Sequence, residues 1–172
     1  MTYYIAGWYD AKDRLTRMMR EVEKRGHTVT SGWLQQTEPG GVGMPPLEVA
    51  KMYATRDIFD IARAQAIIYD TFDESIRQAR TVEWGIAIGM RKYRILVGPG
   101  VMPGVFKTSA HETYESWDAL FAKWDAVAAG VARLDAERQR NADLARRDAA
   151  APSAPTVSLS TRAKRRAFVS NA

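Results

Sequence analysis

The sequence predicts an α/β fold in which a parallel sheet is covered by helices on both faces. Short apolar runs, each followed by glycine or by a polar turn, alternate along the chain with longer segments whose apolar residues have helical spacing. This alternation is typical of parallel sheets, because two parallel strands need a crossover connection that is usually a helix. Right-handed crossovers favour a Rossmann-like or flavodoxin-like arrangement, and we expect the flavodoxin-like strand order 2-1-3-4.

The first strand, helix and second strand follow from local signals. Residues 3–7 form a short apolar run that ends at a glycine, as a buried strand does before a turn. Apolar side chains then recur at helical spacing from about Asp10 to Arg25, and Gly26 follows as a C-terminal stop. Residues 27–31 are predicted to form the second strand, and the Gly- and Pro-rich segment 33–46 a mobile loop.

Two further helix–strand pairs complete the predicted sheet. A helix is expected from about Pro46 to Arg63, followed by a strand over residues 66–70. A third helix over about residues 80–91 leads to a fourth strand over residues 93–98, and Val105-Phe106 is a candidate for a short fifth strand. The apolar face expected for the 46–63 helix consists of Leu47, Ala50, Ala54, Ile58 and Ile61.

The C-terminal part of the chain changes in character. A fourth helix is predicted over residues 113–131, and residues 134–147 could prolong it. Residues 149–160 contain two prolines and too few apolar side chains to bury a core, which predicts a flexible linker. We therefore expect a folded domain over residues 1–131 and a helical extension with a flexible basic tail over residues 132–172.

Composition excludes several classes of chemistry. The chain has no cysteine, which excludes disulfides, thiol catalysis and cysteine-bound zinc, and its two histidines make a histidine-rich metal site improbable. We expect no metal and no cofactor. No apolar run is long enough to cross a bilayer, and the first residues lack the features of a signal peptide. A soluble cytoplasmic protein without membrane contact is the expectation.

The formal net charge of +5 is unevenly distributed. Residues 1–132 hold 16 basic and 16 acidic side chains, whereas residues 133–172 hold 9 basic and 4 acidic ones. The positive charge therefore belongs to the tail and gives no support for nucleic-acid binding by the folded body. The basic cluster Arg162-Ala163-Lys164-Arg165-Arg166 is either a solvated tail or a contact for nucleic acid, an anionic surface or a partner, and both interpretations stay open.

Glu83 is the first candidate for chemistry. It stands among small and apolar residues near a predicted helix start, after the strand 66–70 and a polar loop. A carboxylate in such surroundings is costly, and ligands of open parallel sheets bind where loops leave the carboxyl ends of strands. The alternative is a carboxylate that merely complements the helix dipole.

Several short motifs occur in order over roughly residues 3–125. They are Tyr4-Ile5-Ala6-Gly7, Gly7-Trp8-Tyr9, Arg56-Asp57-Ile58, Glu83-Trp84-Gly85-Ile86-Ala87 and Ile95-Leu96-Val97-Gly98-Pro99. This set resembles the nucleoside 2-deoxyribosyltransferase family, with its bacterial and phage-encoded relatives and the deoxynucleoside monophosphate N-glycosidases. The resemblance implies a flavodoxin-like enzyme, usually a homo-oligomer, that cleaves or exchanges the N-glycosidic bond of a small-molecule deoxynucleoside or deoxynucleotide.

The resemblance also implies roles for single residues. Glu83 takes the position of the nucleophile, and Asp57 that of an aspartate facing the base. Tyr4 matches a tyrosine that orients the nucleophile, with Tyr3 as the alternative if the register slips by one residue. Gly7 and Trp8 would line the base pocket, although a tryptophan is more often a packing anchor.

The expected chemistry needs more than one carboxylate. Loss of the base from deoxyribose passes through an oxocarbenium-like state, which a carboxylate below C1′ can stabilise or trap covalently. The leaving base needs a proton, so a second carboxyl in a different environment is required. For the sugar hydroxyls we select Asp73, with Asp70 behind it, since both stand at or just after the end of the third strand.

Two departures from the family pattern affect the substrate. Ala79 stands where many relatives have glycine, and Gln65-Ala66 where they commonly have aspartate, which puts the loop conformation and the sugar contacts in question. Arg77 and Arg80 could bind a 5′-phosphate, or they are solvent-facing loop residues. Two other functions also stay open: a nucleotide-binding module of the same fold without turnover, and an enzyme for a different ribosylated ligand.

Overall fold

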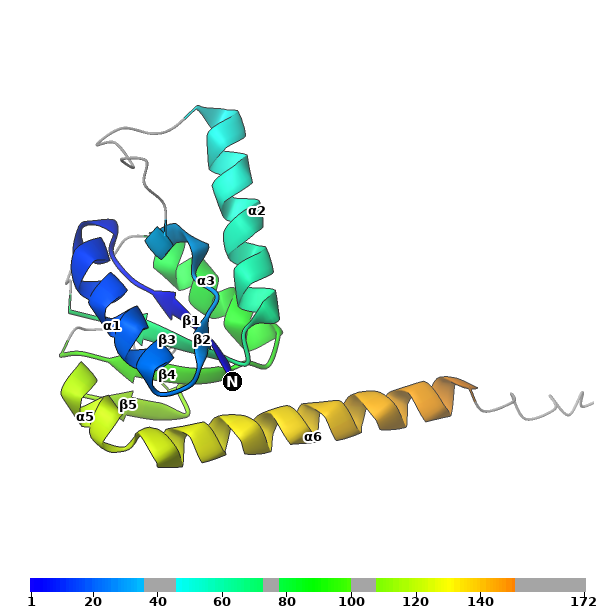
Figure 1. The fold of residues 1–172 in the computed structure, drawn as a ribbon. Coiled ribbons are helices and arrows are strands. Elements are labelled where there is room, and N and C mark those ends of the chain that lie inside the picture. The colour runs from blue at the N-terminus through cyan, green and yellow to red at the C-terminus, as the bar shows by residue number, and fades with distance from the viewer. Residues whose placement is uncertain (36–45, 73–77, 100–107, 151–172) are drawn as a thin grey trace, which may run out of the picture.

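The computed structural model describes residues 1–35, 46–72, 78–99 and 108–150. Within these ranges the chain forms a five-stranded sheet with the order β2-β1-β3-β4-β5, in which each pair is parallel (Figure 1). The predicted α/β class and the order 2-1-3-4 are confirmed, and a fifth strand is added beside β4. The strands are β1 (Thr2–Ala6), β2 (Thr28–Val29), β3 (Ala66–Asp70), β4 (Tyr93–Val97) and β5 (Glu112–Tyr114).

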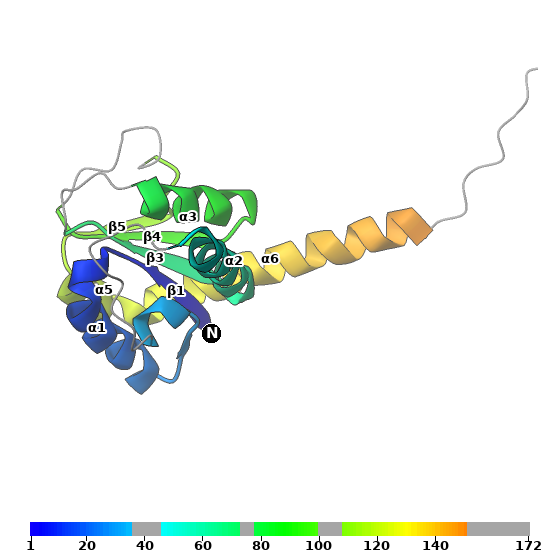
Figure 2. The ribbon, with the colours of Figure 1, turned by 90° about the horizontal axis from the view of Figure 1, so that it is seen from above.

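Helices cover both faces of the sheet (Figure 2). The helices α2 and α3 lie on one face, and α1, α5 and the start of α6 lie on the other. Two short 3₁₀ segments, η1 (Tyr9–Ala11) and η2 (Gly32–Gln35), follow the first two strands. The helices are α1 (Lys12–Lys24), α2 (Leu47–Arg63), α3 (Gln78–Gly89), α5 (Trp117–Ala122) and α6 (Trp124–Ala150).

Strand register brings the carboxyl ends of the central strands together. Ala6 pairs with Tyr69, and Asp70 pairs with Val97, so β1, β3 and β4 end at the same edge of the sheet. Side chains alternate along each strand, which sends Tyr3 to the α1 and α6 face and Tyr4 to the α2 and α3 face. The loops at this edge and the helix α3 that follows β3 are therefore placed for ligand binding.

The prediction of a single helix over residues 113–131 is wrong. Residues 112–114 form β5 beside β4. The first helix after this strand, α5, starts only after Ser116. The Ser116 side chain accepts a hydrogen bond from the Ala119 N–H and caps α5, and α6 begins only at Trp124. The strand expected at Val105-Phe106 lies outside the described residues.

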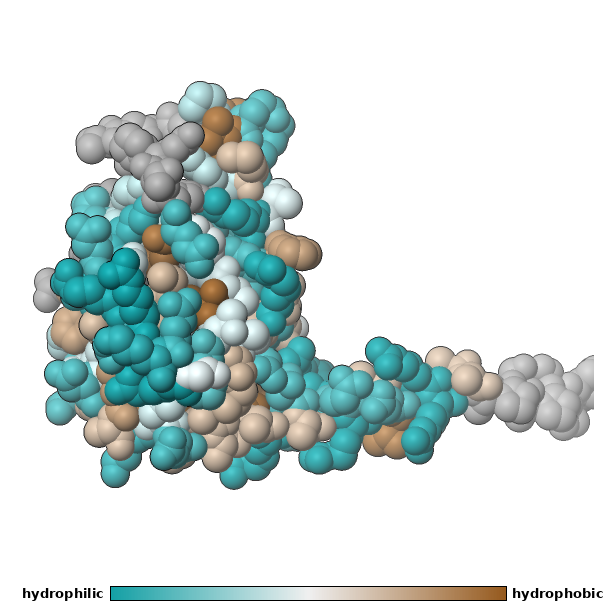
Figure 3. Space-filling model, in the orientation of Figure 1, coloured by the Kyte–Doolittle hydropathy of each residue, from teal (hydrophilic) through white to brown (hydrophobic). Residues whose placement is uncertain are grey.

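Of the apolar face predicted for α2, Ile61 packs into the core, whereas most of the other residues of that face do not. Leu47 and Ile58 are 69% and 44% exposed, and Met52 and Phe59 are exposed as well. Asp60 and Ile61, near its C-terminal end, are the helix's buried residues. Helix α2 stands up from the body, and apolar residues are visible near its start (Figure 3). The apolar residues of α2 therefore reach the core only near its C-terminal end, and those before it, including Leu47 and Ile58, form an exposed surface.

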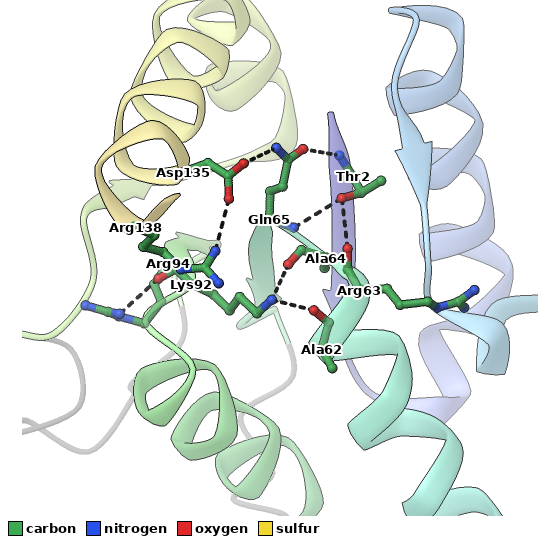
Figure 4. Close-up of polar contacts among 9 residues, drawn as sticks. All are labelled: Thr2, Ala62, Arg63, Ala64, Gln65, Lys92, Arg94, Asp135 and Arg138. Atoms are coloured by element: carbon green, nitrogen blue, oxygen red, sulfur yellow. Dashed lines mark hydrogen bonds and ion pairs between the residues drawn. The ribbon is translucent and has the colours of Figure 1, made fainter. Parts of the chain in front are cut away.

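A polar cluster fastens the opposite end of α2 (Figure 4). Lys92 Nζ donates to the carbonyl oxygens of Ala62 and Ala64, each at 2.6 Å. The Gln65 side chain accepts from the Thr2 N–H and donates to Asp135 of α6. Gln65 therefore lies at the amino end of β3, away from the ligand edge. The glutamine in place of the family's aspartate therefore lies at the other end of the strand from the expected sugar contacts.

Helix α6 crosses the boundary expected at residue 131. Its first turns bury Trp124, Val127, Gly130 and Val131, and Leu134 packs against the same core. The helix then continues past Arg91 of the body, and its last turns towards Ala150 extend away from the body (Figure 1). The basic tail over residues 151–172 lies outside the described residues. No helix in the described part of the chain is both long and apolar enough to span a membrane.

Candidate active site

Tyr4 and Glu83 meet in the layer between the sheet and α3. The Tyr4 hydroxyl donates a hydrogen bond to Glu83 Oε1 at 2.8 Å. Tyr4 is fully buried in the middle of β1, and the neighbouring Trp84 and Ala87 anchor α3 in the core. The contact therefore joins β1 to α3 and involves only one oxygen of the Glu83 carboxyl group, Oε1. The alternative in which Tyr3 takes this place is excluded, because Tyr3 packs against Trp124 on the opposite face.

The environment of Glu83 disfavours its charged form. Loss of hydration on burial is the largest cause and raises the pKa of Glu83 to about 8. The negative charge of Asp57 raises this pKa further, whereas the Tyr4 hydrogen bond and the positive charge of Arg80 lower it. The surroundings of Glu83 therefore act on its pKa in opposite directions. A strongly shifted pKa of this kind is typical of carboxyl groups at functional sites.

Asp57 is the second carboxyl of the site. It lies on the inner side of α2, and its Oδ1 is buried without a hydrogen-bond partner among the described residues. Burial raises the pKa of Asp57 to about 6, an effect that the charge of Arg56 opposes and that of Asp60 reinforces. A half-buried carboxyl with an unoccupied oxygen can exchange a proton or a hydrogen bond with a ligand.

The sequence did not single out the residues that hold α2 in place. Asp60 is buried, accepts from the Gly32 N–H at 2.8 Å and pairs with Arg63 at 2.6 Å. A side chain on Gly32 would collide with the Asp60 carboxylate at 2.9 Å. The three-residue spacing from Asp57 to Asp60 is the signal that could have placed both on the inner face of α2.

Asp70 does not take the role expected for it. It is fully buried, and both of its oxygens accept hydrogen bonds from Arg14 at 2.8 Å. The Trp117 indole N–H donates to it at 2.7 Å, and the Phe72 N–H at 3.3 Å. A carboxylate engaged in this way stabilises the end of β3 and has no oxygen available for a sugar hydroxyl. Asp73, the other residue expected there, lies outside the described residues.

Arg80 is neither in a loop nor exposed to solvent. It occupies the first turn of α3 and is only 5% exposed. Its guanidinium donates to the Asp70 carbonyl oxygen at 3.2 Å and lies 5.7 Å from the centre of the Tyr69 ring. The phosphate contact that the sequence left open for Arg80 therefore loses support, because this side chain already bridges β3 and α3. Arg77 lies outside the described residues, and Ala79 lies in the first turn of α3 and not in a loop.

Gly7 and Trp8 follow β1 at the ligand edge. A Cβ on Gly7 would lie 2.1 Å from Leu15 Cδ1, so a larger residue there would force the buried Leu15 side chain of α1 to move. Trp8 is half-buried, precedes η1 and donates from its indole N–H to Asp10 at 2.9 Å. Both residues lie where a base pocket was expected, and both also have a structural reason for their identity.

Comparison with solved structures gives the fold. A 2-deoxyribosyltransferase from the psychrotolerant Bacillus psychrosaccharolyticus is similar, with a TM-score of 0.55 and 19% identity over 69% of this chain and 88% of that one. The chain has the fold of a 2-deoxyribosyltransferase. The Clostridium botulinum CMP N-glycosidase BcmB is similar as well, with a TM-score of 0.51 and 15% identity over 73% of this chain and 99% of that one.

A third similar structure is a conserved protein from Enterococcus faecalis V583. Its TM-score is 0.53, with 11% identity over 70% of this chain and 94% of that one. No protein-family model matches the sequence, and no curated protein matches it significantly. At these identities the 2-deoxyribosyltransferase likeness concerns the fold, and the reaction has to be argued from the site.

Proposed function

We propose that this protein is an enzyme that cleaves or transfers at the N-glycosidic bond of 2′-deoxynucleosides, with Glu83 as nucleophile. The observation that carries the proposal is the Tyr4–Glu83 hydrogen bond of 2.8 Å, with Asp57 close enough to affect the ionisation of Glu83. The motif resemblance and the shared fold support the same reaction class. Tyr4 would orient the carboxylate, so that its free oxygen faces C1′ of the sugar.

The two carboxyls supply the two halves of a double displacement. Glu83 attacks C1′ and forms an ester with the sugar while the C1′–N bond breaks and its electron pair goes to the base. Asp57 gives its proton to the leaving base nitrogen. In the second half, Asp57 takes a proton from water or from a second base, which bonds to C1′ and releases Glu83 as a carboxylate.

This mechanism requires one proton on the carboxyl pair. With the pKa of Asp57 near 6 and that of Glu83 near 8, the pair holds one proton at neutral pH. The productive arrangement places that proton on Asp57 and leaves Glu83 ionised, whereas the free site favours the reverse. Only part of the one-proton form is thus ready to react before substrate binds.

A test of the proposal is direct detection of free base. The protein is incubated with the four deoxynucleosides, the four monophosphates and the matching ribonucleosides, with and without a second base, and products are separated by chromatography. We expect free base from deoxynucleosides, and a new nucleoside if a second base accepts the sugar. Release of base from none of these substrates would contradict the proposal and favour a binding module. Turnover of ribonucleosides alone would favour a different ribosylated ligand.

A 5′-monophosphate is the second candidate substrate. The similar structure from Clostridium botulinum is by name a CMP N-glycosidase, which favours nucleotides as a class to test. The buried position of Arg80 removes one of the two arginines considered for phosphate binding. The plain nucleoside therefore remains the first choice, and the ratio of kcat/KM for each nucleoside and its monophosphate decides between them.

We also propose that the enzyme is a homo-oligomer in which a second copy covers the outer side of α2. The exposed apolar side chains of this surface are Leu47, Met52, Ile58 and Phe59. Helix α2 begins with Glu48 and ends with Arg63, so an antiparallel copy of α2 would bring opposite charges together at both ends. Phe59→Glu should then yield monomers in sedimentation, and Leu144→Glu, on the free part of α6, serves as the control. An unchanged mass for Phe59→Glu would contradict this interface.

A further inference from the structure

A cavity lies at the edge of the sheet opposite to the candidate active site. It forms where the end of α1 meets the junction of α5 and α6 (Figure 1). Thr28, the first residue of β2, pairs with Thr2, so this edge holds the amino ends of the strands, whereas Glu83 follows the carboxyl end of β3. The cavity, here called the Trp124 cavity, is lined in part by Arg25, His27, Phe121, Lys123, Trp124 and Asp125.

The size and the rings of the Trp124 cavity suit a small planar ligand. Its volume is about 510 Å³, and small-molecule sites typically measure about 300–1,000 Å³. The ring centre of Trp124 lies 5.5 Å from that of His27 and 5.7 Å from that of Phe121. Trp124 is buried, whereas His27 and Phe121 are half-buried and keep part of their rings open to the cavity.

The indole N–H of Trp124 lacks an acceptor. Its Nε1 is buried without a hydrogen-bond partner within the described part of the chain. The other four tryptophans of the chain each donate to an oxygen atom, and they are Trp8, Trp33, Trp84 and Trp117. An unpaired buried donor is unfavourable, and native structures keep few of them. An acceptor supplied from the cavity that Trp124 lines would remove this cost.

The charged side chains of the cavity favour an anion. The Arg25 guanidinium lies 4.2 Å from the centre of the Phe121 ring and pairs with Glu21 on its own helix. Lys123 is exposed and forms no ion pair with any described residue. Burial lowers the pKa of His27, so its ring carries no charge at neutral pH. Asp125 is the acidic residue of the lining, so the cations outnumber it.

We propose that the Trp124 cavity binds a small aromatic anion, whose phosphate or carboxylate group contacts Arg25 and Lys123 while its ring packs against His27 and Phe121. Charge-assisted hydrogen bonds from arginine and lysine are suited to an oxyanion, and aromatic rings to a planar body. A bare oxyanion or a neutral ring would make only one of these two sets of contacts. The site is separate from Glu83 and does not depend on the reaction proposed above.

The experiment follows the indole N–H signals of the full chain by ¹H–¹⁵N NMR. Phenyl phosphate, benzoate, inorganic phosphate and phenol are added in turn, so that phosphate is distinguished from carboxylate and the anion from the ring. Trp124→Phe keeps an aromatic ring and assigns the Trp124 signal. Lys123→Gln removes one cation of the cavity, and Lys51→Gln, on α2, is the matched control. Glu83→Gln tests whether the probes bind at the candidate active site instead.

We expect phenyl phosphate or benzoate to move the Trp124 signal, with an affinity about tenfold or more above those of inorganic phosphate and phenol. Lys123→Gln should weaken this binding about fivefold or more, and Lys51→Gln and Glu83→Gln should leave it unchanged. The proposal is overturned if neither anion moves the Trp124 signal, if phenol binds as tightly as phenyl phosphate, or if Glu83→Gln abolishes binding. Release of base tests the proposed function separately.

Discussion

Helices α2 and α3 lie on the same face of the sheet and carry one carboxyl of the candidate site each, yet they are held very differently. Helix α3 is anchored in the core by Trp84 and Ala87, and Tyr4 fixes its Glu83. Helix α2 is fastened near its C-terminal end, through Asp60 and Lys92, and its outer side is exposed. The proposed nucleophile is thus held by contacts within the core, whereas the proposed proton donor lies on a helix whose outer side is exposed.

The largest effect on turnover is expected from a substitution of Glu83 on α3. Glu83→Gln keeps the shape of the side chain and its Tyr4 contact but removes the negative charge that, in the proposed mechanism, attacks C1′. Turnover should fall by about 10⁴-fold or more, as is usual when a covalent nucleophile is lost. Base release is measured together with the melting temperature, which should change little. Activity within about tenfold of the parent in a folded Glu83→Gln protein would remove Glu83 from the mechanism.

A smaller and substrate-dependent effect is expected on α2. Asp57→Asn removes the proposed proton donor, and general acid catalysis typically contributes about 10²–10⁴-fold. The loss should be greatest for bases that leave poorly, because an activated leaving group needs less protonation. The measurement is kcat/KM for a natural base and for an activated analogue. An equal loss for both would show that Asp57 only positions the substrate or stabilises α2.

Part of this comparison was predictable from the sequence. The strands could be predicted from apolar runs, and Glu83 and Tyr4 from the order of the motifs. Both signals depend on residues that are close together in the sequence. The role of Asp70 was not predictable, since Arg14 and Trp117 are 56 and 47 residues away in the chain. Strand β5 has only three residues, too few for a periodic signal. The apolar pattern of α2 was visible, but periodicity alone does not distinguish a core from a surface that another molecule covers.

The third prediction concerns pH and tests whether the two carboxyls act as a pair. The pair should hold one proton between about pH 6 and about pH 8. Below this range both groups are protonated and no nucleophile remains, and above it both are ionised and no acid remains. We expect kcat/KM to be bell-shaped, falling about tenfold per pH unit on each side. A profile that stays flat to pH 10 would show that no proton from Asp57 is needed.

The smallest effect is expected on the outer side of α3, at Gly85. This glycine lies in the middle of the helix sequence, on its exposed side. A Cβ built on it has open space around it within 4 Å. Since alanine restricts the unfolded chain more than glycine does, Gly85→Ala should stabilise the protein by about 0.5–1 kcal/mol, with turnover unchanged. Denaturant unfolding and base release are the measurements, and Gly26→Ala is the matched control, because the φ of +80° at Gly26 makes the same change unfavourable there. A loss of stability or of turnover in Gly85→Ala would show that another molecule covers this side of α3. The proposed contact would then extend from α2 onto the helix of the nucleophile, and the difference between the two helices would hold only for the isolated chain.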